Sequence, residues 1–366
     1  MKILQLVTAR QYRGAEVFAS LLSEELARGG ENVHFLGLYT PPVNDLRAAG
    51  CTNSDLGGTK AKGFSPALLS RLSSYYREYR PEVIQANGSD TLKYSVALKV
   101  LNPEVKIVYR NISVFSVWVS SELRRRVQRL MFRGVDYITS VSEESRADIV
   151  RTLGFPADRT RVVRRGVKTD AVVDRAAARE RLGASGPTIA LVGKLSPEKN
   201  HGFLLLAFRE LRRRLPEARL WFIGDGPERE ALEQRIKSLD LSDYVRLWGG
   251  QTDVMPFLAA ADVLAITSTV EGIPGVILEG GIQGTPTVSV DVGGVKEVLR
   301  DRETGLLLKG YHVDTFAEAL ATVLTDPALR DRLGRAAQRV VRKEYTLDRA
   351  ARETLDIYYQ ITSTGK

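Results

Sequence analysis

Short apolar runs alternate with amphipathic stretches of helix length along most of the chain, and this alternation constrains the fold more than any other feature. In the first half, strands are expected at Lys2–Val7, Asn32–Leu38, Val83–Ala86, Lys106–Arg110, Tyr137–Val141 and Arg161–Val163. Helices are expected between them at Ala15–Gly29, Pro66–Tyr79, Thr91–Leu101, Ser121–Arg133 and Ser142–Leu153. Strands that alternate with helices predict βαβ units and parallel sheets.

The alternation stops and then restarts in the middle of the chain. Residues 169–187 are rich in Ala and Arg and end in a Gly- and Pro-containing stretch. New strands are then expected at Thr188–Gly193, Arg219–Gly224, Val245–Gly249, Val263–Thr267 and Thr287–Val290. A length of 366 residues is enough for two domains.

We therefore predict an α/β fold with two doubly wound, Rossmann-like domains that face each other across a cleft. The first domain is expected to span residues 1–168 and the second residues 188–345, with residues 169–187 as a linker. A terminal helix within residues 346–366 is expected to pack back across both domains. Ligands of such sheets bind at the carboxyl ends of the strands, so the cleft is the predicted site.

Composition excludes several classes of protein. No apolar stretch approaches the length of a membrane span, and the apolar start at Met1–Val7 is soon followed by Arg10 and Arg13, which favours a buried strand over a signal peptide. A lone Cys51 fits a reducing cytoplasm. The three scattered histidines and the lack of any Asp-x-Asp pair predict no metal site. The net charge of +9 suggests anionic partners such as nucleotide phosphates, anionic lipid or nucleic acid.

Two carboxylates eight residues apart follow the strand expected at 263–267. Glu271 falls on the loop at the end of that strand, and Glu279 falls near the start of the next helix. A helix N-terminus suits an anionic phosphate, and carboxylates accept hydrogen bonds from sugar hydroxyls. The bend between them is expected to line the same substrate site through Gly272, Ile273, Gly275 and Val276. A capped helix with an exposed Glu in its first turn is the structural alternative.

Other polar or glycine-rich turns also follow predicted strands. Lys194 and Lys199 share one loop before a helix expected to be capped by Asn200 or Ser196, and two ammonium groups there would suit a diphosphate. Two exposed surface lysines are the alternative. Gly14, Gly224, Gly250 and Gln251 lie in further turns that are expected to reach the substrate; Gly14 permits close approach to a phosphate, and Gly250 and Gln251 could meet a nucleobase. The turn at Gly224 lacks the third glycine of a dinucleotide fingerprint, which argues against a dehydrogenase.

These turns, taken in order, resemble a known family. The second half carries Gly193-x-Leu-Ser-Pro-Glu-Lys-Asn, Gly224-Asp-Gly-Pro, Ala261-Asp262, the Glu271–Glu279 segment, Gly284-x-Pro and Gly293-Gly-x-x-Glu297. The first half agrees more loosely through Gly14-Ala-Glu16, Val141-Ser-Glu-Glu-Ser-Arg146 and Arg165-Gly166-Val167. Together they resemble the retaining glycosyltransferases of family 4, which have the GT-B fold.

The resemblance implies a role for each matching residue. Lys194 stands where the family usually has Arg, and with Lys199 it would bind the diphosphate of a nucleotide-sugar donor. Glu271 would contact the transferred sugar, and Glu279 would hold the ribose of the donor. The loop of Gly14 would close on the phosphate. The resemblance implies no metal and no cofactor, a donor bound mainly by the second domain, and a glycan or lipid-linked acceptor bound by the first.

One departure from the family concerns the end of the strand at 106–110. Many members have a His there, near the sugar, whereas this chain reads Val108-Tyr-Arg-Asn-Ile-Ser113. Arg110 or Asn111 is expected to replace it, because either side chain can hydrogen-bond a sugar hydroxyl. Asn111 is expected to act in catalysis with Glu271 and Lys199, and Arg110 to bind the substrate. The alternative is that both residues merely end a strand.

The helix expected at Ser121–Arg133 is strongly basic. Its apolar residues form one stripe, Leu123, Val127, Leu130 and Met131, and it is flanked by Arg124, Arg125, Arg126, Arg129 and Arg133. Such a helix would lie on an anionic membrane surface or grip an anionic acceptor. Packing of the stripe on the sheet, with solvated arginines, is the alternative.

The sequence thus predicts a cytoplasmic, metal-independent retaining glycosyltransferase, with peripheral contact to a membrane left open. A sugar-nucleotide epimerase or hydrolase of the same architecture is the nearest alternative, although few histidines are available for acid–base work. A nucleic-acid-binding protein is the alternative from a different class. Aromatic residues are not interleaved with the basic runs, so no nucleic acid is expected as a partner.

Overall fold

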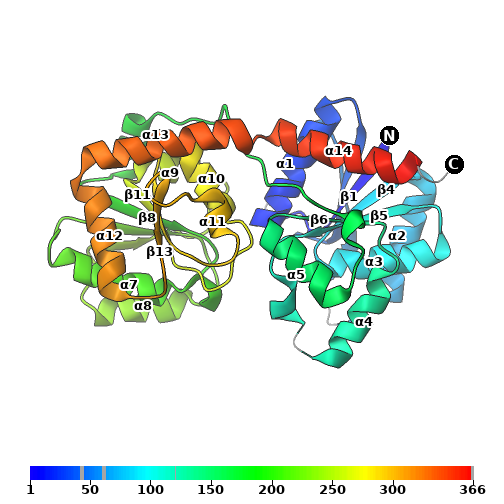
Figure 1. Cartoon of the computed structure of the whole chain (residues 1–366), viewed down its shortest axis with the longest axis horizontal. Coiled ribbons are helices and arrows are strands. Elements are labelled where there is room, and N and C mark those ends of the chain that lie inside the picture. The colour runs from blue at the N-terminus through cyan, green and yellow to red at the C-terminus, as the bar shows by residue number, and fades with distance from the viewer. Residues whose placement is uncertain (42–44, 60–62, 120, 364–366) are drawn as a thin grey trace. The chain divides into compact units, whose positions relative to one another are not determined.

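The computed structural model describes residues 1–41, 45–59, 63–119 and 121–363. It divides into two compact units, shown in Figure 1. The first unit comprises Met1–Gly166 together with Leu347–Lys366, and the second comprises Val167–Thr346.

The first unit is built on a seven-stranded sheet in the order β3-β2-β1-β4-β5-β6-β7, in which neighbouring strands are parallel. Its strands are β1 (Lys2–Ala9), β2 (Asn32–Tyr39), β3 (Thr52–Gly58), β4 (Val83–Asn87), β5 (Lys106–Asn111), β6 (Tyr137–Ser140) and β7 (Thr160–Val162). Its helices are α1 (Gly14–Arg28), α2 (Pro66–Tyr79), α3 (Ser89–Leu101), α4 (Glu122–Phe132), α5 (Glu143–Leu153) and α14 (Leu347–Ser363), with short 3-10 turns η1 (Phe115–Trp118) and η2 (Ala157–Arg159). The strand order reverses between β1 and β4, as in a doubly wound fold.

Helices cover both faces of the first sheet, which is why its strands read as nearly continuous apolar runs. Helices α1 and α14 pack on one face, where Phe18 and Ile357 lie in a cluster with Ile3 and Val108 of the strands. On the other face, α2 and α3 pack on β1, β2 and β4, and α5 packs with Phe132 on β5 and β6.

The terminal helix α14 is bound to the first sheet by a buried hydrogen-bond network. The Tyr358 hydroxyl donates to Gln85 Oε1 at 2.6 Å and accepts from Gln5 Nε2 at 3.0 Å. Gln5 and Gln85 lie on β1 and β4 and also bond to each other, at 3.2 Å. A helix about 350 residues from the start of the chain therefore completes the core of the first unit.

The second unit has a six-stranded parallel sheet in the order β10-β9-β8-β11-β12-β13. Its strands are β8 (Thr188–Val192), β9 (Arg219–Ile223), β10 (Val245–Leu247), β11 (Val263–Ile266), β12 (Thr287–Val290) and β13 (Gly305–Leu308). Its helices are α6 (Arg175–Leu182), α7 (His201–Arg212), α8 (Arg229–Ser238), α9 (Met255–Ala260), α10 (Gly275–Ile282), α11 (Val295–Val298), α12 (Val313–Thr325) and α13 (Pro327–Glu344), with the turn η3 (Pro197–Lys199). The order reverses between β8 and β11.

The segment 169–187, expected to be a linker, contains a helix that belongs to the second unit. Arg175 and Arg179 of α6 bind the buried carboxylate of Asp262 at 2.7 and 3.2 Å. Arg330 of α13 binds the same carboxylate at 3.1 Å, and the Thr188 backbone N–H donates to it at 2.8 Å. Asp262 thus fixes two helices and the start of β8, and the segment is structured because a buried charge requires partners.

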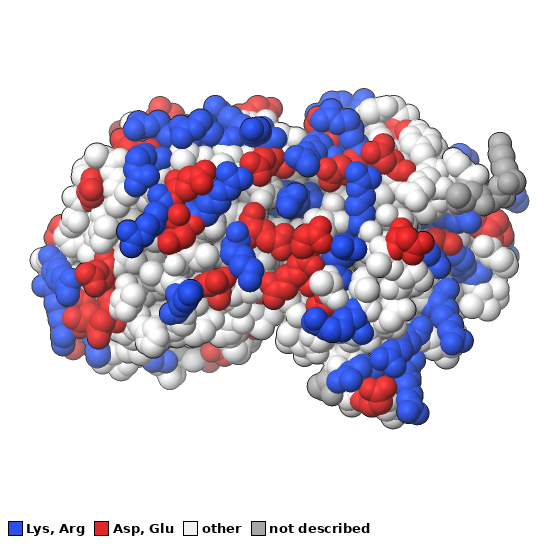
Figure 2. Space-filling view, in the orientation of Figure 1, with Lys and Arg blue, Asp and Glu red and all other residues white. Residues whose placement is uncertain are grey.

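Two basic helices, α4 and α13, differ in whether their apolar residues are buried. In α13 the stripe is buried, with Leu333 0% and Val341 4% exposed. In α4 it faces outward, with Leu123 74%, Val127 57% and Leu130 65% exposed. The expected alternative of a stripe packed on the sheet is therefore wrong for these three residues, and Figure 2 shows basic side chains gathered over both helices.

Candidate functional site

The predicted donor residues of the second unit lie on loops at the carboxyl edge of its sheet. Lys194 and Lys199 follow β8, and Glu271 follows β11. These two strands are neighbours at the point where the strand order reverses. In open α/β sheets this reversal leaves a crevice outside the strand ends, and ligands bind there.

Two residues predicted to act in catalysis form an ion pair at this point. The Lys199 ammonium donates to Glu271 Oε1 at 2.5 Å. The Lys199 side chain is 25% exposed and that of Glu271 is 10% exposed, so the pair is largely shielded from water. The Lys199 side chain runs beside Gly193, where a Cβ would lie 3.4 Å from Lys199 Cε.

Hydrogen bonds to backbone carbonyls fix the loop after β11 against the loop after β8. The Thr267 hydroxyl donates to the Lys199 carbonyl at 2.9 Å, and the Thr269 N–H donates to the Glu198 carbonyl at 2.8 Å. Tyr311 donates from its hydroxyl to the Ser268 carbonyl at 2.7 Å, and burial together with the charge of Glu271 raises the pKa of this phenol. The ion pair is thus preorganised by the fold on both sides.

Glycines in the neighbouring loops serve close approach of one backbone to another. Gly224 has φ +148°, and a Cβ on it would lie 1.9 Å from the Gly193 carbonyl oxygen. Gly293 has φ +54°, and a Cβ there would lie 1.9 Å from the Glu271 carbonyl oxygen. Both positions therefore require glycine for the packing of the loops around Lys199 and Glu271, whatever their contact with substrate.

Other predicted residues of this edge lie on the loops that follow β8 and β10. Lys194 is exposed on the loop, and Asn200 precedes α7 in a left-handed conformation. Within the described part of the chain, neither Asn200 nor Ser196 caps a helix with its side chain. Gln251 donates to the Trp248 carbonyl at 2.8 Å, and Gly250 beside it is exposed. These residues surround the β8, β9 and β10 strand ends.

The segment between the two glutamates forms the entry to α10. Gly275 is the first residue of this helix, and Glu279 lies half-buried one turn further on. Ile273 and Val276 pack against the core below, and Gly272 is buried. The N-terminus of α10 consequently opens on the same loop as Glu271.

Sequence reasoning overlooked His201, the first residue of α7. It is 3% exposed, its Nε2 has no hydrogen-bond partner among the residues that the structure describes, and its ring meets Phe222 edge-on at 5.0 Å between centroids. Burial, and to a smaller extent the nearby Lys199 ammonium, lowers its pKa to about 4. The ring is therefore neutral at physiological pH and adds no charge to the site.

In the first unit, Gly14 and Arg110 are gathered at the carboxyl edge of the sheet. Arg165 Nη1 donates to the Gly14 carbonyl at 3.2 Å. The Arg110 guanidinium is 4% exposed, lies 3.9 Å from the centre of the Phe18 ring, and has its Nη1 unpartnered within the described residues. Burial and the Arg165 charge lower the pKa of Arg110 to about 9. The result is a region of concentrated positive charge beside the start of α1, suited to an anion.

Asn111 is directed differently from Arg110. Its amide donates to the Ser145 carbonyl of α5 at 3.0 Å, and it is 1% exposed. Adjacent residues of a strand point to opposite faces, so the two candidates to replace the family histidine lie on different sides of the sheet. Asn111 already holds α5, whereas Arg110 faces α1.

Arg165, Gly293 and Tyr311 are site neighbours that were not among the predicted site residues. The first two lie within motifs that carried the family resemblance, which is the signal that would have found them. Tyr311 lies in a loop after β13, and nothing local in the sequence links it to Glu271.

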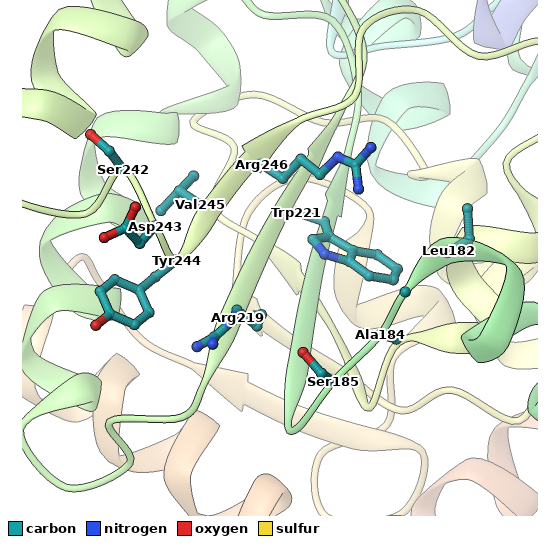
Figure 3. Close-up of a pocket in the computed structure, with 11 residues that line it drawn as sticks. Leu182, Ala184, Ser185, Arg219, Trp221, Ser242, Asp243, Tyr244, Val245 and Arg246 are labelled. Carbon is teal, nitrogen blue, oxygen red and sulfur yellow. The ribbon is translucent and has the colours of Figure 1, made fainter.

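A separate cavity of about 270 Å³ lies away from these residues (Figure 3). Arg219 and Val245, the first residues of β9 and β10, line it together with Trp221 and Tyr244. It therefore opens at the amino ends of strands, opposite to the edge that carries Lys199 and Glu271, and none of the predicted site residues lines it.

The described residues contain no group of three or more His, Cys, Asp and Glu side chains arranged to hold a metal ion. Within the same ranges, no helix is both long and apolar enough to cross a membrane.

Comparison with known families accounts for nearly the whole chain. Residues 12–171 match the model described as Glycosyltransferase Family 4, and residues 174–340 match Glycosyl transferases group 1. Among curated relatives, the lipopolysaccharide core biosynthesis glycosyltransferase LpsE of Rhizobium meliloti is 33% identical over 64% of this chain and 66% of its own length. A GDP-mannose-dependent alpha-(1-6)-phosphatidylinositol monomannoside mannosyltransferase of Mycobacterium tuberculosis is 32% identical over 65% of this chain and 66% of its own. The matches thus span just under two thirds of these relatives.

Solved structures share the whole fold. Sucrose-phosphate synthase from Thermosynechococcus elongatus aligns with a TM-score of 0.85 at 21% identity, over all of both chains. HepE of Anabaena in complex with UDP-glucose aligns with a TM-score of 0.82 at 22% identity, over 100% of this chain and 99% of that one. The two parallel sheets, the ordered loop motifs and the two family models agree, and the chain belongs to the family 4 glycosyltransferases, with the GT-B fold.

Proposed function

We propose that the protein is a retaining glycosyltransferase that moves a hexosyl or N-acetylhexosaminyl group from a nucleoside-diphosphate sugar to a glycan or lipid-linked acceptor, without a metal. The observation that carries the proposal is the Lys199–Glu271 ion pair at the strand-order reversal of the second sheet. The named relatives, which include a GDP-mannose-dependent enzyme, and the HepE complex with UDP-glucose support the class of donor.

Each charge of the pair has a task in such a transfer. The Lys199 ammonium, fixed beside the start of α7, stabilises the negative charge of the departing diphosphate. Glu271 orients that ammonium and offers its other carboxylate oxygen to a hydroxyl of the sugar. Removal of one preorganised donor of this kind typically costs about 3 kcal/mol of transition-state stabilisation.

The first unit supplies the acceptor side in this proposal. Arg110, with Arg165 beside it, provides fixed positive charge near the start of α1, and Gly14 leaves space for a ligand close to the backbone. We assign the position of the missing family histidine to Arg110 rather than to Asn111, because the Asn111 amide is bound to α5. With no side chain assigned as a covalent nucleophile, the proposed route is front-face displacement.

A thermal-shift screen with UDP, GDP, ADP, UDP-glucose and GDP-mannose tests the proposal first. A ligand at 100 times its Kd stabilises the folded protein by about 2.7 kcal/mol, which is a readable increase in melting temperature. The stabilising donor is then incubated with a panel of alkyl glycosides, and NMR of the product gives the anomeric configuration. Inversion would refute retention, and consumption of the donor without any acceptor would indicate a hydrolase or epimerase.

Turnover is expected to survive EDTA, because Lys194 and Lys199 carry the charge that a metal supplies in enzymes with an Asp-x-Asp pair. Loss of turnover on chelation, restored by Mg²⁺ or Mn²⁺, would contradict the proposal.

The two glutamates can be separated by calorimetry. Glu279→Ala is expected to weaken both UDP or GDP and the intact donor, because both contain the ribose that Glu279 holds in this proposal. Glu271→Ala is expected to leave the affinity for the bare nucleotide nearly unchanged and to slow transfer. A hydrogen bond to a charged group contributes about 1.5–3 kcal/mol, well within the range of the method. Equal loss of nucleotide affinity in both variants would overturn the assignment.

A further inference from the structure

We propose that α4, together with η1 and the end of α3, docks on the surface of an anionic phospholipid bilayer. The inference concerns a surface of the first unit and is independent of the proposed sugar transfer, since it makes no use of the donor residues.

The apolar part of this surface lies in three elements of the first unit, of which α3 and α4 are in contact with each other. Thirteen large hydrophobic residues of the described chain are exposed, and seven of them belong to these elements: Val100, Leu101, Val117, Trp118, Leu123, Val127 and Leu130. Exposed apolar residues scattered singly need no explanation, but Val100, Val127 and Leu130 line one groove, and such a contiguous apolar surface indicates an interaction site. Trp118, 63% exposed, has the amphipathic ring that favours a membrane–water interface.

An open groove runs between α3 and α4. It has a volume of about 690 Å³ and is lined mainly by apolar side chains, together with Lys99 and Arg133: Val96, Val100, Pro103, Val127, Leu130 and Met131. Lys99 is ion-paired with Asp136, and Arg133 adds a further positive charge. An apolar groove with a cation beside it matches an acyl chain with its phosphate headgroup.

The charge of α4 complements an anionic surface. The segment 121–133 holds five arginines and one glutamate, a net charge of +4. Glu122 is engaged by Arg125 at 3.2 Å, by Arg129 at 3.5 Å and more distantly by Arg126 at 3.9 Å. By the helical repeat, Arg124 lies on one side of the exposed stripe and Arg126 and Arg133 lie on the other. Long cationic side chains in these places reach headgroups while the stripe enters the interface.

A second basic helix shows why charge alone does not define this surface. Helix α13 carries Arg335, Arg339 and Arg342 on its exposed side, but its apolar residues are buried in the core of the second unit. It can attract an anionic surface and has no stripe to insert. Helix α13 therefore provides a matched control within the same chain.

Co-sedimentation of the whole chain with vesicles tests the proposal, using vesicles of equal parts phosphatidylcholine and phosphatidylglycerol and vesicles of phosphatidylcholine alone. We expect binding to the anionic vesicles. Each basic contact contributes about fivefold to partitioning, so Arg124→Glu/Arg126→Glu/Arg133→Glu should reduce it by about 100-fold or more. Arg335→Glu/Arg339→Glu/Arg342→Glu makes the same change in net charge and should retain most of the binding.

The apolar contribution has its own variant and signal. Leu123→Ser/Val127→Ser/Leu130→Ser should lower vesicle binding at least 10-fold at unchanged charge, because each buried side chain loses apolar contact area. Trp118 fluorescence should shift to shorter wavelength on binding in the parent and not in this variant. The side chains are exposed, so circular dichroism and melting temperature should match the parent.

Three results would overturn the proposal: no vesicle binding by the parent, equal loss in the α4 and α13 arginine variants, or retained binding in the serine variant. Concentration-dependent dimerisation that the serine variant abolishes, without vesicle binding, would assign the surface to a second copy of the chain. Donor binding, measured without vesicles, should be the same in all variants, so failure here leaves the proposed sugar transfer intact.

Discussion

At the scale of single residues, the Lys199–Glu271 pair is both a structural contact and the centre of the proposed chemistry. The two side chains neutralise each other on loops that Thr267 and Thr269 tie together. An incoming diphosphate would share the Lys199 ammonium with Glu271, so the affinity for a nucleotide reflects competition as well as attraction.

We expect Lys199→Ala to lower kcat/KM about 100-fold or more, because the departing diphosphate loses a preorganised positive charge. Lys237→Ala, at an exposed position of α8, is the control and should behave as the parent. Initial rates at several donor concentrations measure the change. A folded Lys199→Ala protein with near-normal turnover would remove this residue from the mechanism.

His201 is expected to make the second unit sensitive to acid. Burial and the Lys199 charge lower the pKa of His201 from 6.5 to about 4. The neutral ring therefore contributes its full stabilisation to the folded state when the pH is above 6.5, the pKa in the unfolded chain. As the pH falls from about 7 to about 5, protonation of the unfolded state should cost about 2 kcal/mol of stability through this group. Urea unfolding followed by tryptophan fluorescence should show a smaller loss in His201→Gln. Identical pH dependence in both proteins would contradict the assigned pKa.

At the scale of elements, Asp262 anchors the first helix of the second unit, α6. Its carboxylate binds arginines from α6 and α13 and the backbone at the start of β8. We expect Asp262→Ala to destabilise this unit by about 3 kcal/mol, since it leaves clustered arginines without their anion. Asp262→Asn keeps an acceptor and should cost less. Chemical unfolding measures both, and a protease-sensitive α6 in Asp262→Ala would locate the change. Equal stability of parent and alanine variant would show that the network contributes little.

Elements were predictable from sequence where local pattern and burial agree. The strands β1, β2, β4, β5 and β8 are apolar runs buried on both faces, and they were expected within one or two residues of their bounds. In contrast, β3 reads Thr-Asn-Ser-Asp-Leu-Gly-Gly at a sheet edge, so no apolar run marks it. Strand β13 was not expected either, although its sequence Gly-Leu-Leu-Leu is apolar. Helix α6 was hidden because Asp262, which anchors it, lies over 80 residues away.

The candidate site, too, was predictable in part from the sequence. Glu271, Lys199 and Gly14 follow strands and lie within ordered motifs, so their position at a sheet edge was predictable. The direct contact between Lys199 and Glu271 was not, because it depends on β8 and β11 being neighbours in the strand order. The exposure of the α4 stripe depends likewise on tertiary packing, which periodicity does not report.

At the scale of the whole molecule, the chain leaves the first unit at Gly166 and returns to it at Leu347. The returning helix α14 is held through Tyr358 to Gln5 and Gln85. We expect Tyr358→Phe to destabilise the first unit by about 1–3 kcal/mol, because two buried amides lose their partner. Hydrogen exchange resolved by segment should show faster exchange in β1 and β4 and no change in β8 and β9. Uniform change across both units would refute a local role for Tyr358.

The return of α14 also determines the order in which the protein matures on the ribosome. Domains generally fold as units during synthesis, the N-terminal one first. Here the second unit is contiguous in the chain and has its full sequence as soon as Thr346 has emerged. The first unit, although translated earlier, must wait for Tyr358 and Ile361 to cover one face of its sheet. Synthesis therefore reverses the order of completion, and the nascent first unit keeps an apolar face open, where a chaperone would bind it, until α14 has emerged.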